Sequence, residues 1–206
     1  MKSIRKHLSG GERREQTVEA VIKLCARADP ATVTTEEIAR QIRVTQGALF
    51  RHFPTKDAIW EAVVEWVAAR IADRVMTAGV GLEDPLQVLE AMFRAHVDFI
   101  ARHPGVPGVL LGQLQHAGST PAKKIARVML ERYRNRVMTL LREAWEKGLL
   151  RAGLSLEAAA IQFVGMVQGL VLQSLIAGKV ARIDEQAPAI FEIYLSGIRA
   201  KEKDKR

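Results

Sequence analysis

Apolar residues recur at the spacing of one helical face along most of the chain, and no run alternates strictly between apolar and polar residues as a half-buried strand does. Clusters of Gly and Pro, GVGLEDP and HPGVPG, separate these helical stretches. The pattern therefore predicts an all-α fold. Beyond the first 55 residues, the expected helices are 56–75, 85–103, 109–116, one that Thr120 and Pro121 begin and Gly148 ends, 156–177, and a last one that Asp184 caps and that reaches Ile198.

Residues 34–60 predict two short helices joined by a tight turn, followed by the start of a third. The first should begin directly after Thr34, which can form a capping box with Glu37. Thr45 is a second N-cap, and Pro54 disfavours helical geometry in the residue before it, so the second helix should end near Phe53. This is the pattern of a helix-turn-helix that binds DNA, although an ordinary three-helix bundle would share it.

The second of these short helices has two distinct faces. Leu49 and Phe53 are spaced to point inward. Amide and guanidinium groups on an exposed helix can pair bidentately with purine edges in a major groove. The outward face is expected to carry Gln46, Gly47, Phe50 and Arg51.

Length and composition place the chain among globular proteins. Its 206 residues are 48% hydrophobic and 26% charged, which is enough for a proper core. The formal net charge of +8 favours polyanionic partners, although charge alone does not separate DNA from an anionic membrane.

Cys25 is the only cysteine and falls on the inner face of the first helix, so it is expected in the core. The histidines lack metal-ligand spacing, and we expect no metal and no cofactor.

The N-terminal segment MKSIRKHLSGGERR is basic but contains no apolar stretch of a secretory signal, so a cytoplasmic location is expected. Two interpretations of its Lys2, Arg5 and Lys6 remain open. They either form an arm that contacts DNA or belong to a disordered tail.

Residues 12–60 resemble the signature of the tetracycline-repressor (TetR) family of bacterial transcription regulators in the motifs TTEEIA, VTQGALFRHF and PTKDAI. The remainder matches only as a pattern of helices. The resemblance implies an N-terminal arm and helix-turn-helix domain over residues 1–55, followed by a helical ligand-binding and dimerisation domain over residues 56–206. It also implies that Thr35 and Glu36 lie near the phosphates and that Lys56 binds a phosphate. The residues that it implies face the DNA are Gln46, Gly47, Ala48, Phe50, Arg51 and His52, and we expect Thr45 among the DNA-binding residues as well.

The chain departs from the family pattern at two positions in this region. Members commonly have Tyr where this chain has Phe50, which removes a hydroxyl that would reach a phosphate. They commonly have Gly where it has Arg43, at the end of the first short helix. Either this turn is not left-handed, or its strain is tolerated because Arg43 reaches a DNA phosphate. The second account is the one we expect.

The helix expected over residues 156–177 is apolar almost all round. Its length would suit a membrane span, but three glutamines interrupt it and no aromatic belt flanks it, so a buried helix and no membrane contact are expected. With the last helix and their copies from a second subunit, it would form a four-helix bundle. The alternative is that this face packs inside the monomer. The expected dimer-interface residues are Gln162, Gly165, Gly169, Gln173, Phe191 and Tyr194.

His96 interrupts an otherwise apolar helical stripe and is the strongest candidate for a residue that contacts a ligand. A core histidine with one hydrogen-bond partner is the alternative. A mostly apolar cavity would favour a hydrophobic or amphipathic small molecule. The expected pocket residues are Met92, Phe93, His96, Ile100, Met129, Tyr133, Val137 and Trp145.

No catalytic motif competes with these assignments, because the sequence holds no Gly-rich phosphate loop, G-x-S-x-G or H-E-x-x-H. We therefore expect no enzyme. The expected function is a homodimeric repressor that binds palindromic operator DNA and is released by a small-molecule effector. The alternative is a helical small-molecule-binding or nucleoid-associated interaction protein that binds DNA only nonspecifically.

Overall fold

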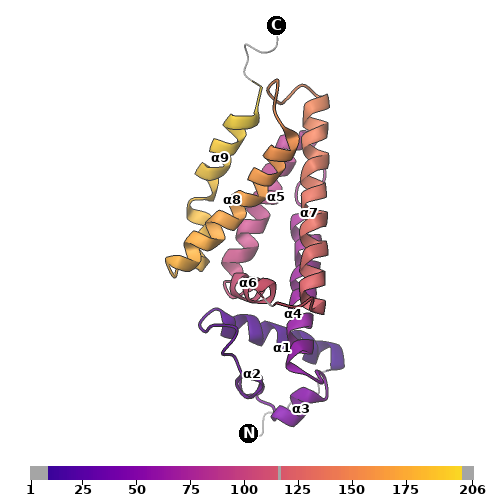
Figure 1. Ribbon diagram of the computed structural model, residues 1–206, viewed down its shortest axis with the longest axis vertical. Coiled ribbons are helices and arrows are strands. Elements are labelled where there is room, and N and C mark those ends of the chain that lie inside the picture. Colours follow the sequence, from indigo (N-terminus) through magenta and orange to yellow (C-terminus); the bar gives the residue numbers. More distant parts are fainter. Residues whose placement is uncertain (1–8, 116, 201–206) are drawn as a thin grey trace. The chain divides into compact units, whose positions relative to one another are not determined.

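The computed structural model describes residues 9–115 and 117–200, and within them the chain is helical with no strand beyond an isolated bridge between Leu150 and Arg199. Figure 1 shows the order of the elements. Lys2, Arg5 and Lys6 lie outside the described residues. The elements are α1 (Gly10–Cys25), α2 (Thr35–Gln41), α3 (Gln46–Phe50), α4 (Lys56–Arg70), η1 (Ile71–Val75), α5 (Pro85–Arg102), α6 (Val106–Gln115), α7 (Pro121–Glu146), α8 (Leu156–Ile176), η2 (Val180–Glu185) and α9 (Ala187–Ile198).

The chain folds into two compact units that do not follow one simple cut in the sequence. The first unit joins the residues up to Val67 with residues 103–126, and the second joins residues 68–102 with the residues from Arg127 onward. The expected division between residues 55 and 56 is therefore corrected, because the start of α4 and all of α6 pack with the helix-turn-helix. Hydrophobic periodicity shows that a segment is a helix but not which neighbour it packs against.

In the first unit, α1 lies between α6 on one side and α2 and α3 on the other (Figure 1). The approach of the α5–α6 connection to α1 depends on Gly105, since an added Cβ there would lie 2.0 Å from the carbonyl oxygen of Ile22. Side chains from α1 to α4 fill the core on the other side of α1, and those at most 1% exposed include Val21, Ile38, Leu49, Phe53, Ile59 and Val63.

In the second unit, α5 packs against η1, α8, η2 and α9. Its core is aromatic: the Phe93 ring lies 5.3 Å from that of Phe191 and 6.2 Å from that of Phe163. The Phe163 ring in turn lies 5.7 Å from Tyr194. These side chains are at most 3% exposed, so they close the centre of the unit.

Three helix ends outside the helix-turn-helix differ from the sequence-based expectation. Helix α6 begins at Val106 rather than Val109, so it starts inside the Gly- and Pro-containing segment that was expected to separate two helices. The helix expected over residues 56–75 is present, but its last turn, Ile71–Val75, is π-helical, and the Met76 N–H donates to the Ile71 carbonyl at 3.1 Å. Asp184 does not cap the last helix as expected. It lies within the 3₁₀ helix η2, and α9 starts after Gln186 without a side-chain cap.

Candidate functional sites

Side-chain caps fix where the two short helices begin. The Glu37 N–H donates to the Thr34 hydroxyl at 3.2 Å, and the Thr34 N–H donates to the Glu37 carboxylate at 2.8 Å. The carboxylate also accepts from the Thr34 hydroxyl at 3.0 Å, and the two hydrogen bonds that it accepts, first that from the Thr34 backbone N–H, hold the pKa of Glu37 below its usual value. The Thr45 hydroxyl accepts from the Ala48 N–H at 3.2 Å. Both starts match the prediction, but α3 ends at Phe50, three positions earlier than Phe53.

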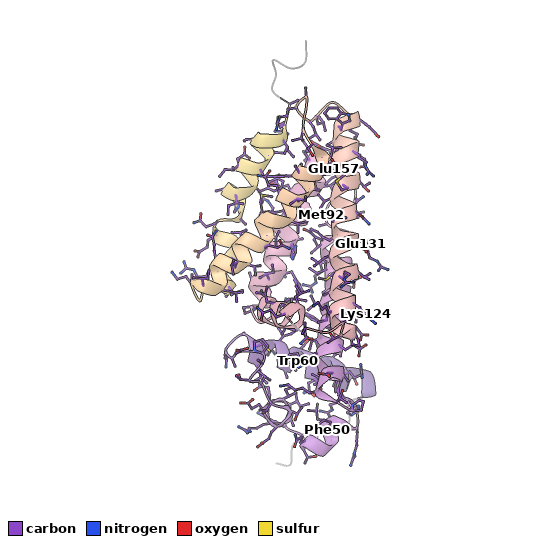
Figure 2. The ribbon with its side chains drawn as sticks, viewed as in Figure 1. Phe50, Trp60, Met92, Lys124, Glu131 and Glu157 are labelled. Atoms are coloured by element: carbon purple, nitrogen blue, oxygen red, sulfur yellow. The ribbon has the colours of Figure 1, made fainter. Side chains whose placement is uncertain are left out.

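The outward face of α3 is open. Leu49 and Phe53 are 1% and 0% exposed, so they anchor the segment to the core. Phe50 is 38% exposed and labelled at α3 in Figure 2. A Cβ added to Gly47 would meet no atom within 4 Å, which leaves the backbone there accessible. We call this exposed set the reading face, and it consists of Gln46, Gly47, Phe50 and Arg51.

The side chains on and around the reading face differ in the contacts that restrain them. The Gln46 amide donates to the Thr35 hydroxyl at 2.6 Å, which links α3 to α2. Glu36 forms an exposed ion pair with Arg40 at 3.3 Å. The Lys56 ammonium lies 5.8 Å from the centre of the Trp60 ring. Ala48 and His52 are half-buried beside the open face, whereas Thr45 is exposed.

Arg43 adopts a left-handed backbone conformation with φ of +58°, the only positive φ at a non-glycine residue among those the structure describes. The Val44 N–H donates to the Ala39 carbonyl at 2.9 Å, and the Arg43 N–H donates to Arg40 at 3.1 Å, which is a Schellman motif. The turn is therefore left-handed, and the first of the two accounts of Arg43 is excluded. Its side chain is exposed and makes no hydrogen bond or ion pair with any described residue.

Two other helices end with the same motif, and both use glycine. Gly148 closes α7 with φ of +67°, and Gly178 closes α8 with φ of +64°. The N–H of Leu149 reaches Ala144 at 2.9 Å, and that of Lys179 reaches Ser174 at 2.8 Å. Arg43 thus occupies a position that this chain elsewhere gives to a residue without a side chain.

Sequence reasoning missed Arg14, which lies on α1. Its Nη1 donates to the carbonyl oxygen of His52 at 3.0 Å, and its guanidinium carbon lies 4.6 Å from the centre of the Phe53 ring. Nothing in the spacing of the sequence reveals this contact, because the two segments are 38 residues apart.

In the second unit, His96 and Tyr133 form a polar pair in apolar surroundings. The His96 Nδ1 lies 3.2 Å from the Tyr133 hydroxyl, and their rings are 5.3 Å apart. Burial lowers the pKa of His96 to about 4 and raises the pKa of Tyr133. Both groups are therefore uncharged at neutral pH. Among the other expected pocket residues, those buried at 3% exposure or less are Met92, Phe93, Ile100 and Val137, and Met129 is half-buried.

Trp145 does not join this group. It is 46% exposed near the end of α7. At about 100° per residue, the twelve positions from Tyr133 to Trp145 turn the side chain roughly 120° around the helix. The expectation that Trp145 lines a buried site is therefore corrected.

The exposed face of α8 and α9 is apolar, but not all of the residues expected at the dimer interface lie on it. Phe191 and Tyr194 are 3% and 1% exposed, and the Tyr194 hydroxyl donates to the Ala159 carbonyl at 3.1 Å. These two side chains belong to the protomer core, so their assignment to a dimer interface was wrong. Gln162, Gly165 and Gln173 are exposed, and Gly169 is half-exposed. The large apolar side chains on the outside are Ile161 (65% exposed), Leu172 (55%), Ile176 (80%) and Ile193 (71%).

Three further features bear on function. Helix α8 is long and apolar enough to cross a membrane by length and composition, a test that core helices also pass. No cluster of three metal-ligating side chains occurs within residues 9–115 and 117–200. Cys25 is buried, and burial raises the pKa of its thiol to about 12, which keeps it protonated and unreactive.

A capped helix pair with an open, polar and aromatic second helix, carried on an all-helical chain, defines a helix-turn-helix DNA-binding protein. The sequence model for bacterial regulatory proteins of the tetR family matches residues 18–63. The model for the C-terminal region of BetI-type transcriptional repressors matches residues 85–200, more than half of the chain. The chain belongs to the TetR family and has the fold of a DNA-binding regulator.

Its relatives include nucleoid occlusion factors. The chain is 29% identical over 181 residues to the nucleoid occlusion factor SlmA of Marinobacter nauticus, covering 84% of this chain and 91% of that protein. It is 27% identical over 162 residues to SlmA of Vibrio cholerae, covering 76% and 81%.

Solved structures share the fold at low sequence identity. The fatty acid degradation regulator FadR from Bacillus halodurans superposes with a TM-score of 0.79 at 18% identity, covering 95% of this chain and 100% of that one. FadR from Bacillus subtilis in complex with stearoyl-CoA has a TM-score of 0.74 at 18% identity, covering 89% and 98%. AibR in complex with isovaleryl coenzyme A and operator DNA has a TM-score of 0.68 at 16% identity, covering 90% and 97%.

Proposed function

We propose that this TetR-family regulator is a cytoplasmic, non-enzymatic homodimeric repressor that binds a palindromic operator and is released by a small-molecule effector. The observation that carries the proposal is the open reading face of α3, with Leu49 and Phe53 holding the helix from behind. A helix of five residues contacts few base pairs, so useful specificity requires two copies related by a two-fold axis.

On operator DNA, the reading face supplies the base contacts. The guanidinium of Arg51 makes no hydrogen bond or ion pair with any described residue and suits the O6 and N7 acceptors of guanine. Arg43 and Lys56 bind phosphates. The other residues proposed within reach of the DNA are Thr35, Glu36, Thr45, Gln46, Gly47, Ala48, Phe50 and His52.

The exposed face of α8 and α9 forms the dimer contact. Ile161, Leu172, Ile176 and Ile193 place apolar surface in water in the isolated protomer, and a second copy would remove it. A Cβ added to Gly165 or Gly169 meets no atom within 4 Å, so the backbone of α8 is open to close approach by a partner helix.

The effector is a hydrophobic or amphipathic small molecule that binds in the second unit. The uncharged pair of His96 and Tyr133, with the buried Phe163 ring 6.2 Å from that of Tyr133, offers a hydrogen bond to a neutral polar group in apolar surroundings. The similar folds of FadR with stearoyl-CoA and AibR with isovaleryl coenzyme A support an amphipathic ligand, one that joins an apolar acyl group to a polar part.

Selection of genomic fragments tests the proposal. The protein is incubated with fragmented DNA in the presence of excess competitor DNA, and the retained fragments are sequenced and footprinted. A short palindrome protected on both half-sites is the expected result. Retention without sequence enrichment would overturn it.

The similarity to SlmA favours a second candidate, a nucleoid-associated interaction protein. In that case, DNA binding would serve to place the protein on the nucleoid, and no effector would release it. The same selection separates the two, because nonspecific binding gives dispersed fragments without a common palindrome.

A further inference from the structure

The backbone that follows α3 is held in place by a side chain of another helix, α1. Arg14 on α1 donates a hydrogen bond of 3.0 Å to the His52 carbonyl and covers the Phe53 ring at 4.6 Å. His52 and Phe53 are the residues through which the chain leaves α3.

Such support matters because α3 has only five residues. Isolated helices shorter than about 12–15 residues are marginal in water, so the orientation of α3 must come from its contacts with the rest of the unit. The Thr35 hydroxyl holds the start of α3 through the Gln46 amide at 2.6 Å. Arg14 provides the corresponding contact at the other end.

The chemistry of arginine suits both contacts at once. A planar guanidinium donates hydrogen bonds within its plane while its face lies on an aromatic ring. A cation at the C-terminal end of a helix also interacts favourably with the helix dipole. The ammonium of a lysine is a point charge on a flexible stem, so it cannot make the in-plane hydrogen bond and the face-on contact with the ring at the same time.

We propose that Arg14 is a positioning residue for operator recognition. It sets the orientation of α3 so that the reading face meets base edges, and it does not act by binding a phosphate. The inference rests on the proposed operator binding and names a residue outside the helix-turn-helix that determines its specificity.

Substitution of two neighbouring arginines tests this role. Arg14→Ala and Arg13→Ala remove the same charge from the same helix, but among the described residues the Arg13 guanidinium bonds only to Gln16 of its own helix, at 2.8 Å. We expect Arg14→Ala to lower the ratio of operator to nonspecific affinity by about tenfold or more. Arg13→Ala should leave that ratio unchanged, and the salt dependence of nonspecific binding should be equal in the two variants.

Arg14→Lys separates positioning from charge. If Arg14 positions α3, lysine should not restore the ratio, and backbone amides of residues 46–53 should exchange hydrogen faster in both Arg14 variants than in Arg13→Ala. Should Arg14→Ala fail to fold, Arg14→Met keeps the aliphatic stem but removes both guanidinium contacts, and it should lower the same ratio.

Three results would overturn the inference. They are an unchanged ratio in Arg14→Ala, full rescue by Arg14→Lys, or equal losses on operator and random DNA with a shallower salt slope, which would indicate a phosphate contact. If the unsubstituted protein shows no operator preference, the proposed function fails and the inference fails with it. A preference that Arg14→Ala retains overturns the inference alone.

Discussion

The Gln46 amide and the Thr35 hydroxyl lie 2.6 Å apart, and this hydrogen bond joins the first residue of α3 to the first residue of α2. One N–H of Gln46 is therefore engaged within the protein, while its carbonyl oxygen and its second N–H remain available to a base. The Arg51 guanidinium makes no such hydrogen bond with any described residue. The guanidinium of Arg51 should then supply the larger share of base discrimination.

Arg51→Ala should weaken operator binding by about 1–3 kcal/mol and relax the preference at one position in each half-site. Lys56→Ala is the control, because loss of a phosphate contact weakens binding to every DNA sequence alike and makes the affinity depend less steeply on salt concentration. Titrations of operator and random duplexes at several salt concentrations measure both. Equal losses on the two duplexes for Arg51→Ala would remove its base-reading role.

Arg43→Gly should raise the free energy of unfolding by about 1 kcal/mol, since glycine adopts a φ of +58° without the cost that a Cβ imposes. Affinity for operator and random DNA should fall together, with a shallower salt dependence, because a phosphate contact is lost. Denaturant melts and DNA titrations report the two effects separately.

Gly148→Ala provides the matched control for Arg43→Gly. The added Cβ meets no atom within 4 Å, so only its φ of +67° opposes the substitution, and stability should fall by a similar amount. Unchanged or lower stability of Arg43→Gly would show that the backbone at residue 43 carries no strain. Unchanged DNA affinity would show that its guanidinium does not contact DNA.

Gly169→Glu should abolish the dimer and operator binding. Within the protomer an added Cβ at Gly169 meets no atom within 4 Å, so the fold should survive, whereas a carboxylate buried without a partner against a second α8 is strongly unfavourable. Sedimentation gives the oligomeric state and circular dichroism the helix content. Thr139→Glu, on the exposed side of α7, controls for the added charge. A dimer that survives Gly169→Glu would place the interface elsewhere.

Stability should fall as the pH is lowered from about 6.5 to about 4, and His96 should account for part of this loss. The folded protein holds this imidazole neutral, so the unfolded chain binds an additional proton across that window and is favoured by acid. A shift of this size corresponds to on the order of 3 kcal/mol. In denaturant melts, the free energy of unfolding of the unsubstituted protein should gain on that of His96→Gln as the pH rises from about 4 to about 6.5. Parallel curves would contradict the prediction.

Gly105→Ala should lower the free energy of unfolding by about 1–3 kcal/mol, because the new methyl group would lie 2.0 Å from the Ile22 carbonyl and 2.8 Å from the Ala26 nitrogen. Gly112→Ala on α6 is the control. Its nearest neighbour is Pro30 at 3.9 Å, an ordinary contact, and the gain in helix propensity should leave stability unchanged or higher. A Gly105→Ala variant as stable as this control would show that the close approach is not required.

Local chemistry in the sequence predicted the start of α2 and α3 and the left-handed turn at Arg43, because caps and glycine-like positions act between residues close in the chain. Contacts between distant segments could not be predicted in this way. The Arg14 contact with His52 and the packing of α6 on α1 belong to this class. Tyr194 shows the same limit, since an apolar stripe at helical spacing does not reveal whether it packs in its own protomer or against another.

The packing of residues 103–126 with the helix-turn-helix limits how such a regulator can be recombined. A chimera made with a single crossover after Val67 would combine a foreign α1 with the resident Gly105, whose contact with Ile22 tolerates no added atom. Exchange of the whole first unit therefore needs two junctions, chosen together. Point substitutions on the reading face require no junction at all. They are therefore the easier route by which such a regulator acquires a new operator.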